Sequence, residues 1–253
     1  MASIGETTLW RWLSEDAIKP WRYRSWIFPR DPAFEEKAGQ ILDLYAGSWK
    51  GLPLTDDDYI LSADEKTSIQ ARCRRQPTEP PAPGRALRVE HEYRRQGAWA
   101  YLAAWDVRRA KVFGRCEPTT GIQPFGRLVE QVMSQPPYCT ARRVFWIVDN
   151  GSSHRGQACK DRLKALWPNL VVVHTPIHAS WLNQVEIYLS IVQRKVLTPN
   201  DFEDLTALRD RLLEFQEHYQ VIAQPFQWKF TRHKLHRLLN KLNAPEQTLR
   251  RAA

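Results

Sequence analysis

Hydrophobic residues in the second half of the chain fall into short continuous blocks separated by mixed segments. Residues 144–148 and 170–173 are uninterrupted apolar runs, which is typical of strands buried on both faces of a sheet. Residues 158–166 lie between them and have the hydrophobic spacing of a helix. This order predicts two parallel strands that are joined by a right-handed helical crossover.

A further helix is expected from Ser180, which is a favourable N-terminal cap. Apolar positions at helical spacing define its buried face: Leu182, Val185, Leu189, Val192 and Val196. The basic region 205–242 is predicted to form two helices that break around Gln224 and Pro225.

The first half of the chain contains both helical and strand-like periodicity. The predicted elements are a helix over 32–45, a strand over 58–70, a hairpin of 98–105 with 111–116, and a helix over 125–133. Four prolines within residues 76–84 predict a loop.

The first 30 residues have a different pattern. Residues 7–13 carry apolar side chains at helical spacing and predict a short helix. Residues 19–32 mix basic, aromatic and proline residues, a composition that disfavours a regular helix. Two interpretations of this segment stay open: an extended arm whose arginines lie along a nucleic-acid backbone, or an ordinary proline-rich linker.

Composition indicates a folded chain. Its 253 residues are 43% hydrophobic, which is enough to form a core and excludes a disordered protein. No apolar run approaches the ~20 residues of a membrane span, and residues 1–6 lack the pattern of a signal peptide. We therefore expect a soluble, cytoplasmic protein without a membrane partner.

Charge and cysteine content narrow the function further. The 37 Lys and Arg against 28 Asp and Glu give a formal net charge of +9. This favours polyanion binding, because cationic side chains release condensed counterions from phosphates, although a solvated basic surface has the same composition. The cysteines, at positions 73, 116, 139 and 159, form no CxxC pair, so we expect reduced thiols and no zinc site.

Three acidic residues are candidates for chemistry. Asp149 directly follows the apolar run 144–148, at the edge where open α/β sheets bind ligands. Asp64 interrupts an apolar strand, and Glu186 lies at the margin of a buried helical face. Taken singly, each has an ordinary interpretation as a turn, edge-strand or solvated helix residue. Taken together, two strands and a helix can gather all three at one end of a sheet.

Three convergent carboxylates are hard oxygen ligands that suit Mg²⁺ or Mn²⁺. Two such ions, ~3.5–4 Å apart, can clamp the attacking and leaving oxygens of a phosphoryl displacement. A hard-metal site combined with a polyanion-binding surface predicts a phosphodiester enzyme.

Several motifs resemble one family. Residues 174–186 read HTPIHASWLNQVE, and residues 148–150 read VDN, followed by His154. With SADEKT at 62–67 and EHEYRRQG at 90–97, these stretches resemble the catalytic core of bacterial insertion-sequence transposases related to the mariner elements. Those proteins carry a DDE endonuclease domain, and the resemblance extends over nearly the whole chain.

The resemblance implies a ribonuclease-H-like fold of the α/β class, in which helices flank a mixed sheet. It also implies that Asp64, Asp149 and Glu186 are catalytic and bind two Mg²⁺ or Mn²⁺ ions. The implied reaction is cleavage of the element's end by metal-activated water, followed by attack of the freed 3′-hydroxyl on target DNA. We expect a homo-oligomer on DNA, acting at the nucleoid in the bacterial cytoplasm.

Further residues are expected near the site or in contact with DNA. In the catalytic domain they are Asn150, His154, Trp181 and Asn183, and in the N-terminal segment they are Arg11, Arg22 and Arg24. For His154, a loop histidine with a structural hydrogen bond is an equal alternative.

The chain departs from the family pattern at its start. Family members begin with a helix-turn-helix region, of which residues 7–13 resemble only the last, recognition-type helix. We therefore expect a truncated transposase, with a partial helix-turn-helix remnant and basic arm at 1–30 and the catalytic domain with C-terminal helices at 31–253. Two alternatives stay open: a catalytically incompetent remnant that only binds DNA or a partner, and a cellular ribonuclease of the same fold.

Overall fold

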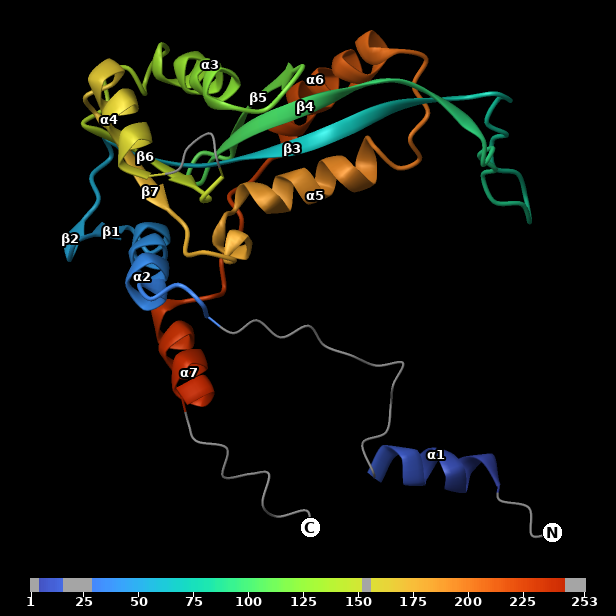
Figure 1. Ribbon diagram of the computed structural model, residues 1–253, viewed down its shortest axis with the longest axis horizontal. Coiled ribbons are helices and arrows are strands. Elements are labelled where there is room, and N and C mark those ends of the chain that lie inside the picture. The colour runs from blue at the N-terminus through green and yellow to red at the C-terminus, as the bar shows by residue number, and fades with distance from the viewer. Residues whose placement is uncertain (1–4, 16–28, 152–155, 244–253) are drawn as a thin grey trace.

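A five-stranded mixed sheet organises the computed structural model, which describes residues 5–15, 29–151 and 156–243 (Figure 1). The strands are β3 (Asp58–Arg74), β4 (Tyr93–Asp106), β5 (Lys111–Glu117), β6 (Arg143–Val148) and β7 (Leu170–His174). They lie in the order β5-β4-β3-β6-β7. β3, β4 and β5 form an antiparallel meander, whereas β6 is parallel to both β3 and β7. The predicted α/β class and the parallel crossover unit are confirmed.

The remaining elements are helices and one short ribbon. They are α1 (Glu6–Glu15), α2 (Phe34–Tyr45), α3 (Ile122–Met133), α4 (Gly156–Leu166), the 3-10 turn η1 (Ser180–Leu182), α5 (Val185–Lys195), α6 (Leu205–Ile222), α7 (Arg232–Asn243), and the ribbon of β1 (Ser48–Trp49) with β2 (Leu52–Pro53). Each predicted helix is present, and the C-terminal pair is interrupted where the sequence indicates.

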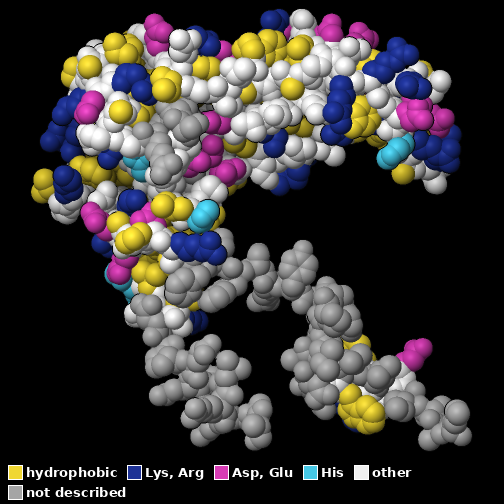
Figure 2. Space-filling model, viewed as in Figure 1, with side chains coloured by type: hydrophobic (Ala, Val, Ile, Leu, Met, Phe, Trp, Pro, Cys, Tyr) yellow, Lys and Arg dark blue, Asp and Glu magenta, His cyan; other side chains and the backbone are white. Residues whose placement is uncertain are grey.

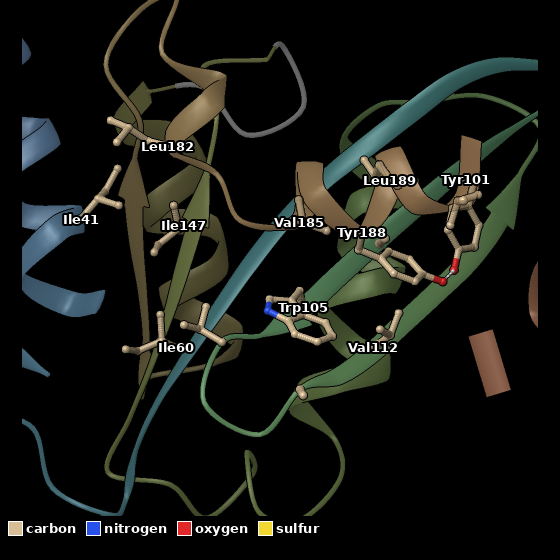
Figure 3. Packing of buried hydrophobic residues seen from close by; sticks show 14 of the residues in the cluster. Ile41, Ile60, Tyr101, Trp105, Val112, Ile147, Leu182, Val185, Tyr188 and Leu189 are labelled. Atoms are coloured by element: carbon tan, nitrogen blue, oxygen red, sulfur yellow. Dashed lines mark hydrogen bonds between the residues drawn. The ribbon is translucent and has the colours of Figure 1, made fainter. Parts of the chain in front are cut away.

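Helices cover both faces of the sheet, because side chains alternate between the faces along each strand. α2, α5 and α6 pack on one face around Ile60, Trp105 and Ile147 (Figure 3). α3 and α4 pack on the other face, around Leu61 and Trp146. The sheet is therefore the middle layer of the protein, and residues two apart on β3 face the same helices.

Strands β3 and β4 run further than the sequence predicts. β3 continues to Arg74, and β4 already begins at Tyr93. Their charged and polar ends hide the alternation that identifies a strand, but the backbone ladder continues through register shifts after Lys66 and Gln70. The two ends and the loop between them project from the body as a hairpin arm (Figure 1).

The prediction that Ser180 caps a helix is wrong. Residues 180–182 form the 3-10 turn, Asn183 has an extended backbone, and α5 begins at Val185. The Val185 N–H donates to the Ser62 hydroxyl of β3 at 2.8 Å. A hydrogen bond from a distant strand therefore fixes the start of this helix, and local sequence could not reveal it.

A buried ion pair fastens the first residues of the parallel strands β3 and β6. Asp58 and Arg143 are register partners, and the guanidinium donates to both carboxylate oxygens at 2.8 and 2.9 Å. The Asp58 side chain is fully buried, and this pairing lowers its pKa to about 2 against the opposing effect of burial. The pair holds the two strands in register before they reach Asp64 and Asp149.

We expect Asp58→Asn to lower the free energy of unfolding at pH 7 by about 3 kcal/mol, because Arg143 would lose its buried partner. The pKa of Asp58 is lower in the fold than in the unfolded chain, so its contribution is present above pH 4 and is lost as pH falls towards 2. Urea unfolding at pH 7 and pH 3 would measure both effects. Glu214→Gln is the control, because it removes the exposed ion pair between Glu214 and Arg211. It should lower the free energy of unfolding by less than ~0.5 kcal/mol. Equal losses in the two variants would contradict the prediction.

The N-terminal helix, the cysteines and the lengths of the helices bear on the remaining predictions. α1 confirms the predicted N-terminal helix, whereas most of the predicted basic arm, including Arg22 and Arg24, lies outside the described residues. All four cysteines are free thiols, as predicted. In the part of the chain that the structure describes, no helix is both long and apolar enough to cross a membrane.

Candidate functional site

The structure brings Asp64, Asp149 and Glu186 together at one end of the sheet. β3 and β6 are parallel, and Ser62 pairs with Ile147, so the same register carried two residues further sets Asp64 beside Asp149. Glu186 lies in the first turn of α5, which covers the face of β3 to which Asp64 belongs. Figure 2 shows Asp and Glu side chains gathered beside the start of this helix.

The carboxylates affect one another's charge. Burial is the main cause that raises the pKa of Asp64 to about 7, and repulsion from Asp149 and Glu186 adds to it. A hydrogen bond from the Glu65 N–H to Asp64 Oδ1, at 2.8 Å, acts in the opposite direction. Burial also raises the pKa of Glu186, against a hydrogen bond with Asp64 and the charge of Lys66. The site therefore concentrates negative charge in partly desolvated surroundings.

A buried network around Asn183 connects two of the carboxylate-bearing elements. The Asn183 amide donates to the Ala63 carbonyl at 2.8 Å and lies 3.5 Å from Asp64 Oδ2. Its own oxygen accepts a short hydrogen bond from the Ser62 hydroxyl, which in turn accepts from the Val185 N–H. The backbone on both sides of Asp64 and the first turn of α5 are thereby held to each other.

Asp149 and the turn after it are held by separate bonds. Asp149 Oδ1 accepts from the Gly151 N–H at 2.7 Å. The Asn150 amide donates to the Thr175 carbonyl at 2.6 Å, just past the end of β7. Asn150 thus ties the ends of β6 and β7 together rather than pointing at the other carboxylates.

The other predicted residues lie on other elements or outside the described residues. Trp181 is in η1, partly exposed, with its ring edge-on to Phe230 at 5.1 Å between centroids. Arg11 is an exposed residue of α1. His154, like Arg22 and Arg24, lies outside the described residues. Of the predicted supporting residues that are described, Asn183 is the one that contacts a carboxylate of the trio.

Two contributors were missed by sequence reasoning. Ser62 links Asn183 to the start of α5, and its position two residues before Asp64, on the same face, is the signal that could have identified it. The Tyr45 hydroxyl of α2 donates to the Leu182 carbonyl at 2.8 Å and thereby holds η1 against α2. Nothing in the local pattern distinguishes Tyr45 from any other apolar position of its helix.

The donor set suits a hard divalent cation. Carboxylate oxygens from Asp64, Asp149 and Glu186, with raised pKa values on two of them, favour a bound cation that offsets their repulsion. Within residues 5–15, 29–151 and 156–243, no group of three or more acidic, His or Cys side chains has the spacing to hold a metal ion. The fit to a cation therefore rests on the chemistry of the donors and on their mutual repulsion.

Sequence comparison gives one family. A protein-family model described as "DDE superfamily endonuclease" matches residues 59–209, a span that contains all three carboxylates and Asn183. No curated protein matches the sequence.

Structural comparison gives transposase complexes of similar fold. The Mos1 mariner paired-end complex with Mn has a TM-score of 0.53 at 16% identity, over 93% of this chain and 68% of that chain. The paired-end complex with Mg has a TM-score of 0.51 at 16% identity with the same coverage. The Mos1 strand transfer complex gives 0.52 at 14% identity, over 94% of this chain and 68% of that one. These similarities confirm the ribonuclease-H-like fold class.

Proposed function

The chain belongs to the DDE superfamily of endonucleases, and on this premise we propose that it is a transposase that cuts DNA and joins the cut end to target DNA. The observation that carries the proposal is the meeting of Asp64, Asp149 and Glu186 from two strands and a helix at one end of the sheet. A trio of this kind serves both steps, because cleavage and joining are each in-line displacements at phosphorus.

Asp64, Asp149 and Glu186 are the residues that would hold Mg²⁺ or Mn²⁺, and two ions are proposed. When bound, such ions polarise the attacking and leaving oxygens. The chain's own groups set the geometry: Asn183 steadies the Asp64 carboxylate, and the Gly151 N–H fixes one oxygen of Asp149. Structures of similar fold were crystallised with Mn and with Mg, which supports this choice of cation.

The finer assignments are also proposals. Residues 174–186, which resemble insertion-sequence transposases, support an origin in a bacterial mobile element that acts at the nucleoid. The proposed DNA partners are the element ends and the target, bound by a homo-oligomer, and complexes of similar fold are paired-end and strand transfer assemblies. We assign residues 31–253 to catalysis. Trp181, His154 and residues 1–30 with Arg11, Arg22 and Arg24 are assigned to DNA contacts.

The test is the nicking of supercoiled plasmid DNA by the purified protein. We expect nicked and linear products with Mn²⁺ or Mg²⁺, none with EDTA, and recovery when excess Mg²⁺ is restored, because carboxylates alone cannot activate water at phosphorus. Parallel reactions on an RNA–DNA hybrid would separate a transposase from a ribonuclease. Preferential cleavage of the hybrid, or no cleavage of either substrate with any divalent cation, would refute the proposal.

A further inference from the structure

A groove runs along one free edge of the sheet. β7 is the last strand of the sheet, and no described strand pairs with its outer side. α2 and α4 pack on opposite faces, and between them, beside β7, lie two hollows of about 490 and 600 Å³. Gln40, Gln157, Lys160 and Val172 line both hollows. The two hollows are therefore one continuous groove, which we call the β7 groove.

Basic side chains outnumber the two acidic ones, Glu36 and Asp161, in the wall of the β7 groove. Lys50, Arg142, Lys160 and Lys164 line it, and the Arg142 side chain is 57% exposed. Across the described parts of the chain, no ion pair engages Lys50, Lys160 or Lys164. Figure 2 shows Lys and Arg side chains along this edge, between α4 and the β1–β2 ribbon. Unpaired lysines that converge on one concave edge favour an anionic ligand with repeated charges.

The groove reaches Asn150, the residue that follows Asp149. Arg142 and Asn169, at the start of β6 and β7, line one hollow, and Asn150, the residue after Asp149, lines the other. The groove thus follows the five residues of β7, on the order of 16 Å. One DNA strand places a charge every ~3.4 Å along the helix axis, so this length faces several consecutive phosphates.

We propose that the β7 groove binds the sugar–phosphate backbone of a DNA strand and leads it to the carboxylates. The inference rests on the proposed function and adds to it a binding surface. Lysines supply the charge. The amides of Gln40 and Gln157 each donate one N–H to a neighbouring carboxylate, Glu36 and Asp161, and have a second N–H for a phosphate oxygen. An acidic peptide that pairs with the free edge of β7 is the competing ligand. We favour DNA because the lysines follow the groove as repeated charges.

The test compares two triple variants that lose the same charge. The groove variant carries Lys50→Ala, Lys160→Ala and Lys164→Ala. The control carries Lys111→Ala, Arg209→Ala and Arg211→Ala, on β5 and on α6, which packs against β5 at the opposite edge of the sheet. Fluorescence anisotropy with a labelled 30-base-pair duplex in EDTA, over a range of salt concentrations, measures affinity without cleavage. Thermal unfolding of both variants checks that each is folded.

In the groove variant, we expect the slope of log affinity against log salt to become shallower by about 2.7, because each phosphate contact contributes ~0.9. Binding at 0.15 M salt should weaken at least tenfold, whereas the control should change by less than threefold. Equal slopes in groove variant, control and unmodified protein would overturn the proposal. Loss of binding to a labelled polyglutamate peptide with an unchanged DNA slope would also overturn it, in favour of a peptide site.

This outcome is independent of the proposed chemistry. A protein that binds DNA through the groove but never nicks plasmid would refute the transposase proposal and leave the groove standing. Normal nicking by the unmodified protein, with a salt slope that the groove variant does not alter, would refute the groove and support the transposase proposal. Lys164→Glu alone offers a second variant, and it should weaken duplex binding more than a single Lys164→Ala, because it adds repulsion to the lost contact.

Discussion

Asp149→Asn is expected to lower Mg²⁺-dependent cleavage of duplex DNA by at least ~10³-fold, which corresponds to about 4 kcal/mol of transition-state stabilisation. Asp149 directly follows β6, and one of its oxygens is already held by the Gly151 N–H. The amide keeps the shape of the side chain but removes the negative charge that a divalent cation needs. Single-turnover cleavage of a labelled duplex measures the loss. Asp64→Asn and Glu186→Gln should behave alike.

Glu65→Gln is the matched control for this series. Glu65 neighbours Asp64, but its side chain belongs to the opposite face of β3. We expect its cleavage rate to stay within about threefold of the unmodified protein, because it loses the same charge without losing a cation ligand. Duplex binding in EDTA should be retained by all of these variants. Full activity of any carboxylate variant would remove that residue from the site, and full activity of all three would end the proposed mechanism.

The same variants should reveal the cost of the site to stability. The pKa of Asp64 is about 7 in the fold, above its ordinary value of 3.8, so its ionisation opposes folding. The contribution of Asp64 to the free energy of unfolding is therefore fully present below pH 4 and is lost as the pH rises through 7. In metal-free buffer at pH 8, Asp64→Asn should raise the free energy of unfolding by about 2 kcal/mol relative to the unmodified protein. Urea unfolding measures this difference. At pH 4 the difference should nearly vanish.

Asn183→Ala is expected to raise the Mg²⁺ concentration for half-maximal cleavage by ~10- to 100-fold, the usual effect of losing a group that orients a metal ligand. The Asn183 amide bonds the Ala63 carbonyl and approaches Asp64 Oδ2, so its loss frees the carboxylate to rotate. High Mg²⁺ should restore much of the rate, because the three carboxylates remain. Cleavage rates over a Mg²⁺ titration measure the shift.

Asn200→Ala separates orientation of the carboxylate from general support of β3. Asn200 also forms hydrogen bonds with β3. Its amide N–H donates to the Gln70 carbonyl at 2.8 Å, and its side-chain oxygen accepts from the Arg72 N–H at 3.1 Å. It lies further along β3, away from the trio. Both substitutions should reduce the free energy of unfolding by ~1–3 kcal/mol, because buried partners are left unpaired. Only Asn183→Ala should change the Mg²⁺ dependence, and equal Mg²⁺ curves would reduce Asn183 to a structural residue.

Most of the secondary structure follows from the sequence. The apolar runs 144–148 and 170–173 are strands, and the elements on either side of the Gln224–Pro225 break are helices. The prediction that 170–173 is buried on both faces is wrong, because β7 is an edge strand and is only half-buried. The start of α5 does not follow, because Ser180 has the better cap chemistry but the cap is Ser62, more than a hundred residues earlier. The outer part of the hairpin arm was missed for a related reason. Its strands are paired mainly through backbone bonds, which leave little hydrophobic pattern.

The candidate site divides in the same way. Asp64, Asp149 and Glu186 were identified from their places within predicted elements and from resemblance to a family. Asn183 was also expected near the site, but its bonds to Ser62 and Ala63 were not predicted, and neither was the β7 groove, because the partners come from segments that are distant in the sequence. Lys50, for example, precedes β3 and Lys160 follows β6 in the sequence, and the two meet only at the edge of the sheet.

The sequence by itself determined most strands and helices, most side chains that face the core, and the three carboxylates that are candidates for chemistry. These are properties of local periodicity, which a few neighbouring residues encode. Only the tertiary structure decided that β3 lies beside β6, that Ser62 caps α5, and that α2 and α4 leave a basic groove along β7. The physical reason is that packing between distant segments depends on the sum of many contacts, and no single stretch of chain carries that information.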